Sequence, residues 1–160
     1  MGLSFIIKKG MEENTMQQNS FLGRGINDYL YAKDSMKDQT QKEYNWPAVI
    51  FAQAAEKLLK AVIEVEFVED SQCIGLMRTH NLRTIVAKIL EKFPDAKLNA
   101  KDCKWLGDFY FDARYPGDDF IVVTLEDGLE AMRIVENILK EVEKILTSKE
   151  ARSLFEQIRG

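Results

Sequence analysis

The sequence Pro47-Ala-Val-Ile-Phe-Ala-Gln-Ala-Ala-Glu-Lys-Leu-Leu-Lys-Ala-Val-Ile-Glu-Val-Glu-Phe67 decides the fold of this chain. It contains no glycine, and its single proline at the start suits the first turn of a helix. With a helical step of about 100° per residue, one narrow sector is polar: Gln53, Lys57, Lys60 and Glu64. The opposite sector is apolar: Phe51, Ala55, Leu58 and Val62. We therefore predict a central helix with one packed face and one polar face.

Two segments on either side of this stretch also show the apolar spacing of helices. Residues 26–40 carry apolar side chains mostly on one side and are the least regular of the predicted helices. Residues 82–93 carry a full apolar stripe, which begins after the cap candidates Thr79 and Asn81 and stops at Pro94. Both segments are therefore predicted to be amphipathic helices.

The second half of the chain continues the helical pattern. Residues 99–113 begin with the N-cap candidate Asn99, and residues 124–146 begin with a capping box, Thr124-Leu-Glu-Asp127. Apolar residues in the second of these segments repeat every seven positions, which is typical of a long bundle helix. Residues 148–160 are predicted to form a short C-terminal helical tail.

The predicted fold is all-α, because the alternating apolar and polar pattern of strands is rare in this chain. We predict an antiparallel up-and-down bundle of four to five helices over residues 21–147, with irregular connections at residues 70–77 and 114–123. Residues 1–20 turn polar after a short apolar run and are expected to be a flexible N-terminal extension. No window approaches the length of a membrane span.

The composition limits the classes of function. Of the 160 residues, 46% are apolar, which suffices for the core of one domain. The 22 basic and 26 acidic residues give a net charge of −4, which argues against binding along an extended nucleic-acid backbone. Two distant cysteines, Cys73 and Cys103, and one histidine indicate neither a disulfide framework nor a metal site. We expect a cytoplasmic protein without a cofactor.

A helix break at residues 112–119, Asp-Ala-Arg-Tyr-Pro-Gly-Asp-Asp, presents the most informative side chains for function. Pro116 cannot continue a helix and disfavours helical geometry before it, so Arg114 and Tyr115 should project from a helix end. An arginine and a tyrosine placed there suit recognition of a phosphate and stacking on a base. Alternatively, Arg114 pairs with Asp118 or with an acid on another helix, and the tyrosine packs the loop against the bundle.

Three motifs, in this order, resemble the HEPN domain family of prokaryotes and higher eukaryotes. They are Phe51-Ala-Gln-Ala-Ala-Glu-Lys-Leu-Leu-Lys-Ala61, Thr79-His-Asn-Leu82 and Ala113-Arg-Tyr-Pro116, and a long closing helix follows them. The resemblance covers about residues 24–147 and implies an all-α bundle that usually dimerises. It also implies a family associated with nucleotide binding, RNA cleavage and toxin–antitoxin pairs, with a separately encoded nucleotidyltransferase as partner.

The chain departs from the ribonuclease members of that family. Those members carry an arginine followed, after four to six residues, by a histidine that can act as acid or base. Here His80 is the only histidine, and Arg114 is followed by Tyr-Pro-Gly-Asp-Asp. We therefore expect a non-catalytic domain that binds a nucleotide or a partner protein. The alternative is RNA cleavage without a metal, which would need His80 and Arg114 to meet in space or across a dimer.

Six residues are candidates for ligand binding: Arg114, Tyr115, His80, Lys57, Lys60 and Tyr110. The two lysines lie in the polar sector of the central helix, where pairing with Glu56 or Glu64 is the alternative to ligand binding. His80 comes just before a helix start, whose free N–H groups favour an anion, or it is only a packed neighbour of the cap. No catalytic residue and no metal ligand is assigned.

Large aromatic residues near the second and fourth predicted helices exceed what one side of a small bundle needs to bury. They are Trp46, Trp105, Phe109, Tyr110 and Phe111. Some of them are expected to contact a second subunit, which predicts a homodimer. Alternatively, the N-terminal extension or the C-terminal tail covers them, and the chain is a monomer.

Overall fold

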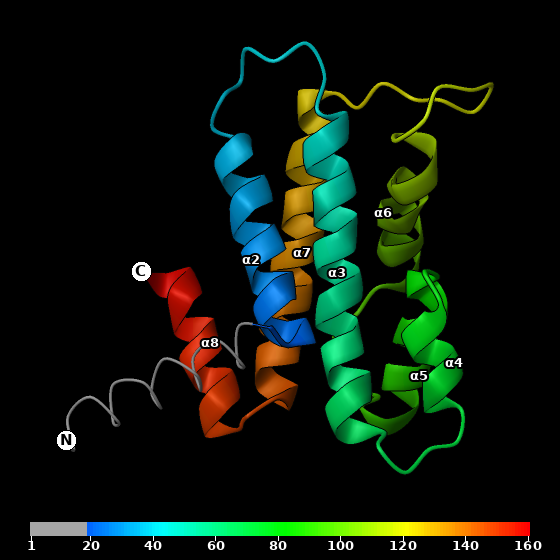
Figure 1. Cartoon of the computed structure of the whole chain (residues 1–160), viewed down its shortest axis with the longest axis vertical. Helices are drawn as coiled ribbons and strands as arrows, with labels where there is room; N and C mark the ends of the chain where they lie inside the picture. The colour runs from blue at the N-terminus through cyan, green and yellow to red at the C-terminus, as the bar shows by residue number, and fades with distance from the viewer. Residues whose placement is uncertain (1–18) are drawn as a thin grey trace, which may run out of the picture.

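A computed structural model describes residues 19–160, and within these residues all regular secondary structure is helical. Four helices form the bundle: α2 (Phe21–Ser35), α3 (Asn45–Glu66), α6 (Ala100–Asp112) and α7 (Leu125–Ile145). Helices α2 and α6 run in one direction, and α3 and α7 run in the other (Figure 1). The predicted all-α bundle is therefore confirmed. Over the same residues, no helix combines the length and the apolar composition needed to cross a bilayer.

Helix α3 lies at the centre of the bundle and contacts α2, α5, α6 and α7. Its apolar sector is fully buried, with Phe51 and Leu58 both at 0% exposure. The prediction of one polar face needs a correction, because Lys60 on that face is only 4% exposed. Within the polar sector Lys60 is covered by neighbouring segments and Gln53 and Lys57 are half-buried, whereas Glu64 is exposed.

Three shorter helices complete the described fold: α4 (Cys73–Arg78), α5 (Leu82–Lys92) and α8 (Lys149–Arg159). Helix α4 lies in a stretch that was predicted to be irregular, and that prediction was wrong. A helix of six residues that includes a glycine has a weak local signal, and burial of Leu76 helps to hold it in place. Helices α5 and α6 pack on each other and on α3, whereas α8 packs mainly on α2.

Side-chain caps start the later helices where the sequence predicted them. The Asn81 side chain accepts a hydrogen bond from the amide of Thr84 at 3.1 Å, and Asn99 caps α6 in the same way. Thr124 and Asp127 form the predicted capping box at the start of α7. These starts were predictable because a cap acts on amide groups only two or three residues away.

The first predicted helix was placed too late in the chain. Helix α2 ends at Ser35, whereas residues 26–40 were expected to be helical. It starts earlier because the side chain of Ser20 accepts a hydrogen bond from a main-chain amide in the first turn. Gly25 inside this helix has a tertiary role: a Cβ atom there would lie 3.0 Å from Cγ of Leu58, so glycine allows α2 and α3 to approach closely. Of the extension predicted at residues 1–20, residues 1–18 lie outside the described residues, and Ser20 is the N-cap of α2.

Candidate functional site

The ring of Tyr110, near the end of α6, contacts two side chains that are far apart from each other in the sequence. The imidazole of His80, which precedes α5, stacks on its ring with centroids 5.1 Å apart and an interplanar angle of 15°. The guanidinium carbon of Arg114 lies 4.4 Å from the centroid of the same ring. The packing of α5 against α6 therefore brings an acid–base side chain and a permanent cation together.

Arg114 is held by tyrosines and not by an acid. Its Nη2 donates a hydrogen bond to Oη of Tyr115 at 3.0 Å, and its guanidinium carbon lies 4.9 Å from that ring. Desolvation is the largest single influence and opposes the charge, but the interactions with Tyr110 and Tyr115 together outweigh it, so the pKa of Arg114 lies above its usual value. Within residues 19–160 Arg114 makes no ion pair with Asp118 or another carboxylate, and the side chain of Tyr115 is 64% exposed.

Glu56 of α3 connects the histidine to a buried lysine. Its carboxylate oxygens lie 3.1 and 3.0 Å from Nδ1 of His80, and one of them accepts a hydrogen bond from Nζ of Lys60 at 2.6 Å. Because an ionised carboxylate can only accept, we assign the imidazole proton to Nδ1. The other ring nitrogen, Nε2, is then the one that can receive a proton or, in the charged form, donate one.

The two lysines of the polar sector have different environments. Lys60 has a side-chain exposure of 5% and forms an ion pair with Glu56, so its role is to position that carboxylate. Lys57 pairs with Asp28 of α2 and keeps 32% of its side chain exposed. It contributes to a hollow of about 250 Å³ between α3 and the His80–Tyr110 stack.

Sequence reasoning missed the role of Asn45, which positions the loop after α6. Its Nδ2 donates to the carbonyls of Ala113 and Ile121 at 3.2 and 2.7 Å, and its Oδ1 accepts from the amide of Val123 at 2.7 Å. Asn45 is only 4% exposed. No local signal could have shown this, because the loop is about seventy positions further along the chain.

The role of Glu56 was also missed, since the sequence indicated it only as a helical partner of Lys60. The contacts that join Glu56, Asp28 and Arg114 to the cluster around His80 and Tyr110 include three permanent cations and two carboxylates. The cations are Lys57, Lys60 and Arg114. This small positive excess occurs in a protein with an acidic net charge. In the described part of the chain, no group of His, Cys, Asp or Glu side chains is arranged to hold a metal ion.

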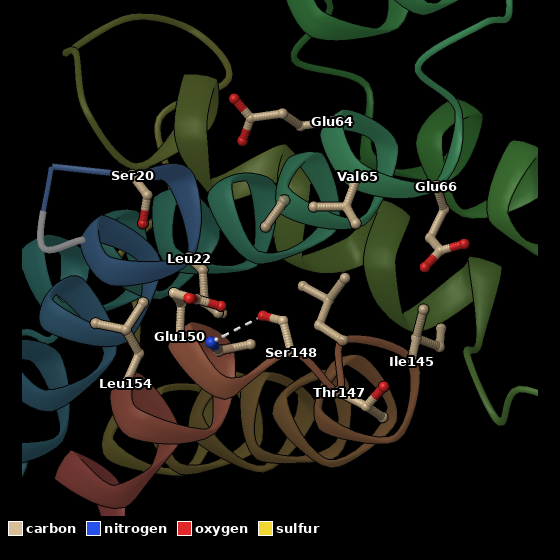
Figure 2. Close-up of a pocket in the computed structure, with 13 residues that line it drawn as sticks. Ser20, Leu22, Glu64, Val65, Glu66, Ile145, Thr147, Ser148, Glu150 and Leu154 are labelled. Carbon is tan, nitrogen blue, oxygen red and sulfur yellow. Dashed lines mark hydrogen bonds between the residues drawn. The ribbon is translucent and has the colours of Figure 1, made fainter. Parts of the chain in front are cut away.

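A separate hollow lies between the start of α2, the end of α3 and the turn from α7 to α8 (Figure 2). Its volume is about 640 Å³. Apolar side chains such as Leu22, Val65 and Leu154 line it, and a hydrogen bond from the Ala151 amide to Ser148 joins two of its lining residues. None of the six candidate residues contributes to it. We therefore place the candidate site at the Tyr110 cluster, where ionisable side chains converge.

The fold and the cluster define an all-α bundle domain with a polar site between its central helix and the α5–α6 pair. A comparison with protein-family models matches the HEPN domain over residues 19–145. The chain belongs to the HEPN domain family, as the three motifs had suggested. A search of curated proteins and a search of solved structures found no match. The family match ends with α7, so α8 lies beyond it.

Proposed function

We propose that this HEPN domain binds a nucleotide, with the phosphate at Arg114. The single observation that carries the proposal is the environment of this guanidinium: it lies over Tyr110, donates a hydrogen bond to Tyr115 and has no carboxylate partner within residues 19–160. The other two cations of the cluster are paired with acids. The planar fork of an arginine that is held in place by aromatic rings is well suited to two hydrogen bonds with a phosphate.

The aromatic residues favour a nucleotide over a simple phosphate ester. Tyr115 and Phe111 are 64% and 60% exposed; Tyr115 contacts Arg114, and Phe111 packs edge-on against Tyr110. Exposed aromatic rings beside a phosphate site provide stacking surfaces for a base. His80 supports the same assignment, because its Nε2 donates a hydrogen bond to an anion when the ring is protonated.

Isothermal titration calorimetry with AMP tests this proposal. Arg114→Ala should weaken AMP binding about ten- to hundredfold, because a hydrogen-bonded charge pair is lost. The melting temperature should change little, because this arginine makes no ion pair within the described chain. Arg152→Ala on α8 is the control, since it removes an exposed arginine outside the cluster. Equal AMP affinity of the Arg114 variant and the wild type would refute the role of Arg114.

RNA cleavage is the second candidate, and the pairing of His80 with Glu56 favours it. A carboxylate that orients Nδ1 leaves Nε2 able to remove the proton from a 2′-hydroxyl group, and Arg114 can stabilise the charge that develops on the phosphate. The arginine–histidine spacing of ribonuclease members is absent, but Tyr110 brings both side chains to one ring. Degradation of an RNA oligonucleotide that His80→Ala abolishes would support cleavage. Intact RNA after prolonged incubation with the wild type would exclude it.

We also propose a homodimer that buries the surface around Trp46. This side chain is 61% exposed, and Ile121 and Val122 in the loop held by Asn45 are 39% and 59% exposed. Exposed apolar side chains of neighbouring segments are typical of an interface. Light scattering after size exclusion should give twice the chain mass for the wild type and a monomer for Trp46→Ser. Tyr31→Ser, at another exposed aromatic residue, should remain a dimer.

A separately encoded nucleotidyltransferase is the other occupant that the family resemblance suggests for this surface. A wild-type monomer at micromolar concentration would contradict the homodimer. A complex of that monomer with a nucleotidyltransferase, lost in Trp46→Ser, would instead assign the surface to the enzyme. The two partners are therefore distinguished by two masses: that of the wild-type chain alone, and that of the same chain after mixing with the nucleotidyltransferase.

A further inference from the structure

Another hollow, of about 360 Å³, shares His80 with the 250 Å³ hollow beside Lys57. It lies between residues 79–82, at the start of α5, and one side of α6. Leu82 and Cys103, which are 3% and 1% exposed, provide a buried apolar base for it, and the exposed ring of Phe111 borders it. Burial raises the pKa of Cys103 to about 12, so the thiol is neutral and acts as an apolar contact.

Gly107 lines this hollow from the interior of α6. A glycine inside a helix is unfavourable relative to alanine, because its backbone loses more freedom on folding. A Cβ atom at this position would lie 3.5 Å from Cγ of Leu82, which is an ordinary van der Waals contact. No glycine in the described residues has a positive φ angle. Neither packing nor backbone geometry therefore requires glycine here.

Two other helical glycines show the contrast. A Cβ atom at Gly25 would lie 3.0 Å from Leu58, and one at Gly128 would lie 2.7 Å from Cε of Met36. At these positions glycine allows neighbouring segments to pack closely. The absence of a side chain at Gly107 has a different effect, since it leaves space in the hollow beside His80.

We propose that this hollow is the subsite for the base of the nucleotide and that Gly107 keeps it open. The inference rests on the proposed nucleotide binding and adds the place of the base. A flat ring fits over the apolar surface of Leu82 and Cys103 and beside Phe111, with the phosphate directed towards His80 and Arg114. The ligand class is a nucleoside monophosphate.

The rim of the hollow offers polar groups for the edge of a base. Lys104 and Asp108, one helical turn apart on α6, form an ion pair at 3.0 Å and are both at least half exposed. They provide one donor and one acceptor at the border of the hollow, and an apolar pocket with a few polar groups at its edge is typical of small-molecule sites. Exposed pairs of this kind are weakly held, so either group can turn to a ligand.

Calorimetric titrations with AMP and with ribose 5-phosphate, which lacks the base, test the subsite. The wild type should bind AMP about tenfold more tightly than ribose 5-phosphate, because only AMP gains contacts of the base. Gly107→Leu should reduce the affinity for AMP to that for ribose 5-phosphate and leave the latter unchanged. Gly75→Leu is the matched control, because nothing lies within 4 Å of a Cβ atom at this position on α4.

Gly107→Ala keeps the test informative if the leucine variant does not fold. The added methyl group makes only an ordinary contact, so this variant should melt at or above the temperature of the wild type and still lose part of the preference for AMP. Equal binding of AMP and ribose 5-phosphate by the wild type, or full AMP affinity in a folded Gly107→Leu protein, would overturn the subsite alone. A wild type that binds neither ligand would overturn the proposed function together with it.

Discussion

The imidazole of His80 lies nearly parallel to the ring of Tyr110, 5.1 Å away, although the two residues are thirty positions apart in the sequence. Tyr110 also contacts the guanidinium of Arg114. One aromatic ring therefore determines the distance between the only histidine of the chain and the cation at the helix break. Each side chain has a second anchor, which is Glu56 for the histidine and Tyr115 for the arginine.

Replacement of Tyr110 should weaken nucleotide binding without a change in any charged group. Tyr110→Ala should lower the affinity for AMP about tenfold, because ring stacking and a cation–π contact each contribute about 0.5–1.5 kcal/mol. Tyr110→Phe keeps the ring and should bind almost as the wild type does. Calorimetry measures both, with Tyr31→Ala as the control at an exposed tyrosine. Wild-type affinity in a folded Tyr110→Ala protein would show that the ring does not contribute to binding.

Glu56→Gln should destabilise the fold as well as the site. The side chain of its partner Lys60 is 5% exposed, and loss of the negative charge leaves a buried ammonium group without compensation. We expect a loss of about 3 kcal/mol in the free energy of unfolding, measured by urea denaturation. The double variant Glu56→Gln, Lys60→Met should regain most of it, because both members of the pair are then uncharged. A single variant as stable as the wild type would contradict this account.

Asn45→Ala should loosen the loop that follows α6. The variant loses three hydrogen bonds of a buried side chain, which corresponds to about 2–4 kcal/mol in the free energy of unfolding. Nucleotide affinity should also fall, because the same loop carries Arg114. The control is Asn137→Ala, which removes one exposed hydrogen bond to the carbonyl of Lys97 and should cost less than 1 kcal/mol. Equal stability losses in the two variants would disprove the special role of Asn45.

The contribution of Glu141 to stability should depend on pH. Desolvation alone would raise its pKa, but hydrogen bonds from Lys144 and from the amide of Lys97 outweigh this and lower it below the usual value. The carboxylate therefore stabilises the fold above the unfolded-state pKa, about 4.3, and this stability is lost as the pH falls through the lower folded-state value. Melting curves of Glu141→Gln should approach those of the wild type as the pH falls from 7 to 3. A constant difference over this range would contradict the assignment.

Most of the helical architecture could be predicted because its signals are local. Asn81, Asn99 and Thr124 act on amides in the following turn, so their residue types alone predicted three helix starts. The early start of α2 was not apparent, since Gly25 has a low helix propensity and is explained only by contact with Leu58. Helix α4 was not predicted, because it is too short to show apolar periodicity.

The candidate site was predictable only in part. Pro116 indicated that Arg114 and Tyr115 project from the end of a helix, and this is a property of the local chain. Nothing in the sequence indicated that His80 would stack on Tyr110 or that Asn45 would bond to the loop near Arg114. Each of these contacts joins residues that belong to different helices or loops.

The sequence by itself determined the helical class, most helix limits, the family motifs and the helix break beside Arg114. Caps, proline and apolar periodicity act over a few residues, so their effects follow from residue order alone. Tertiary structure decided which side chains surround that arginine and which lysine is buried. The helix α3, the segment before α5 and the end of α6 meet only when their apolar faces are buried together, and that packing determines where Glu56, His80 and Tyr110 come into contact.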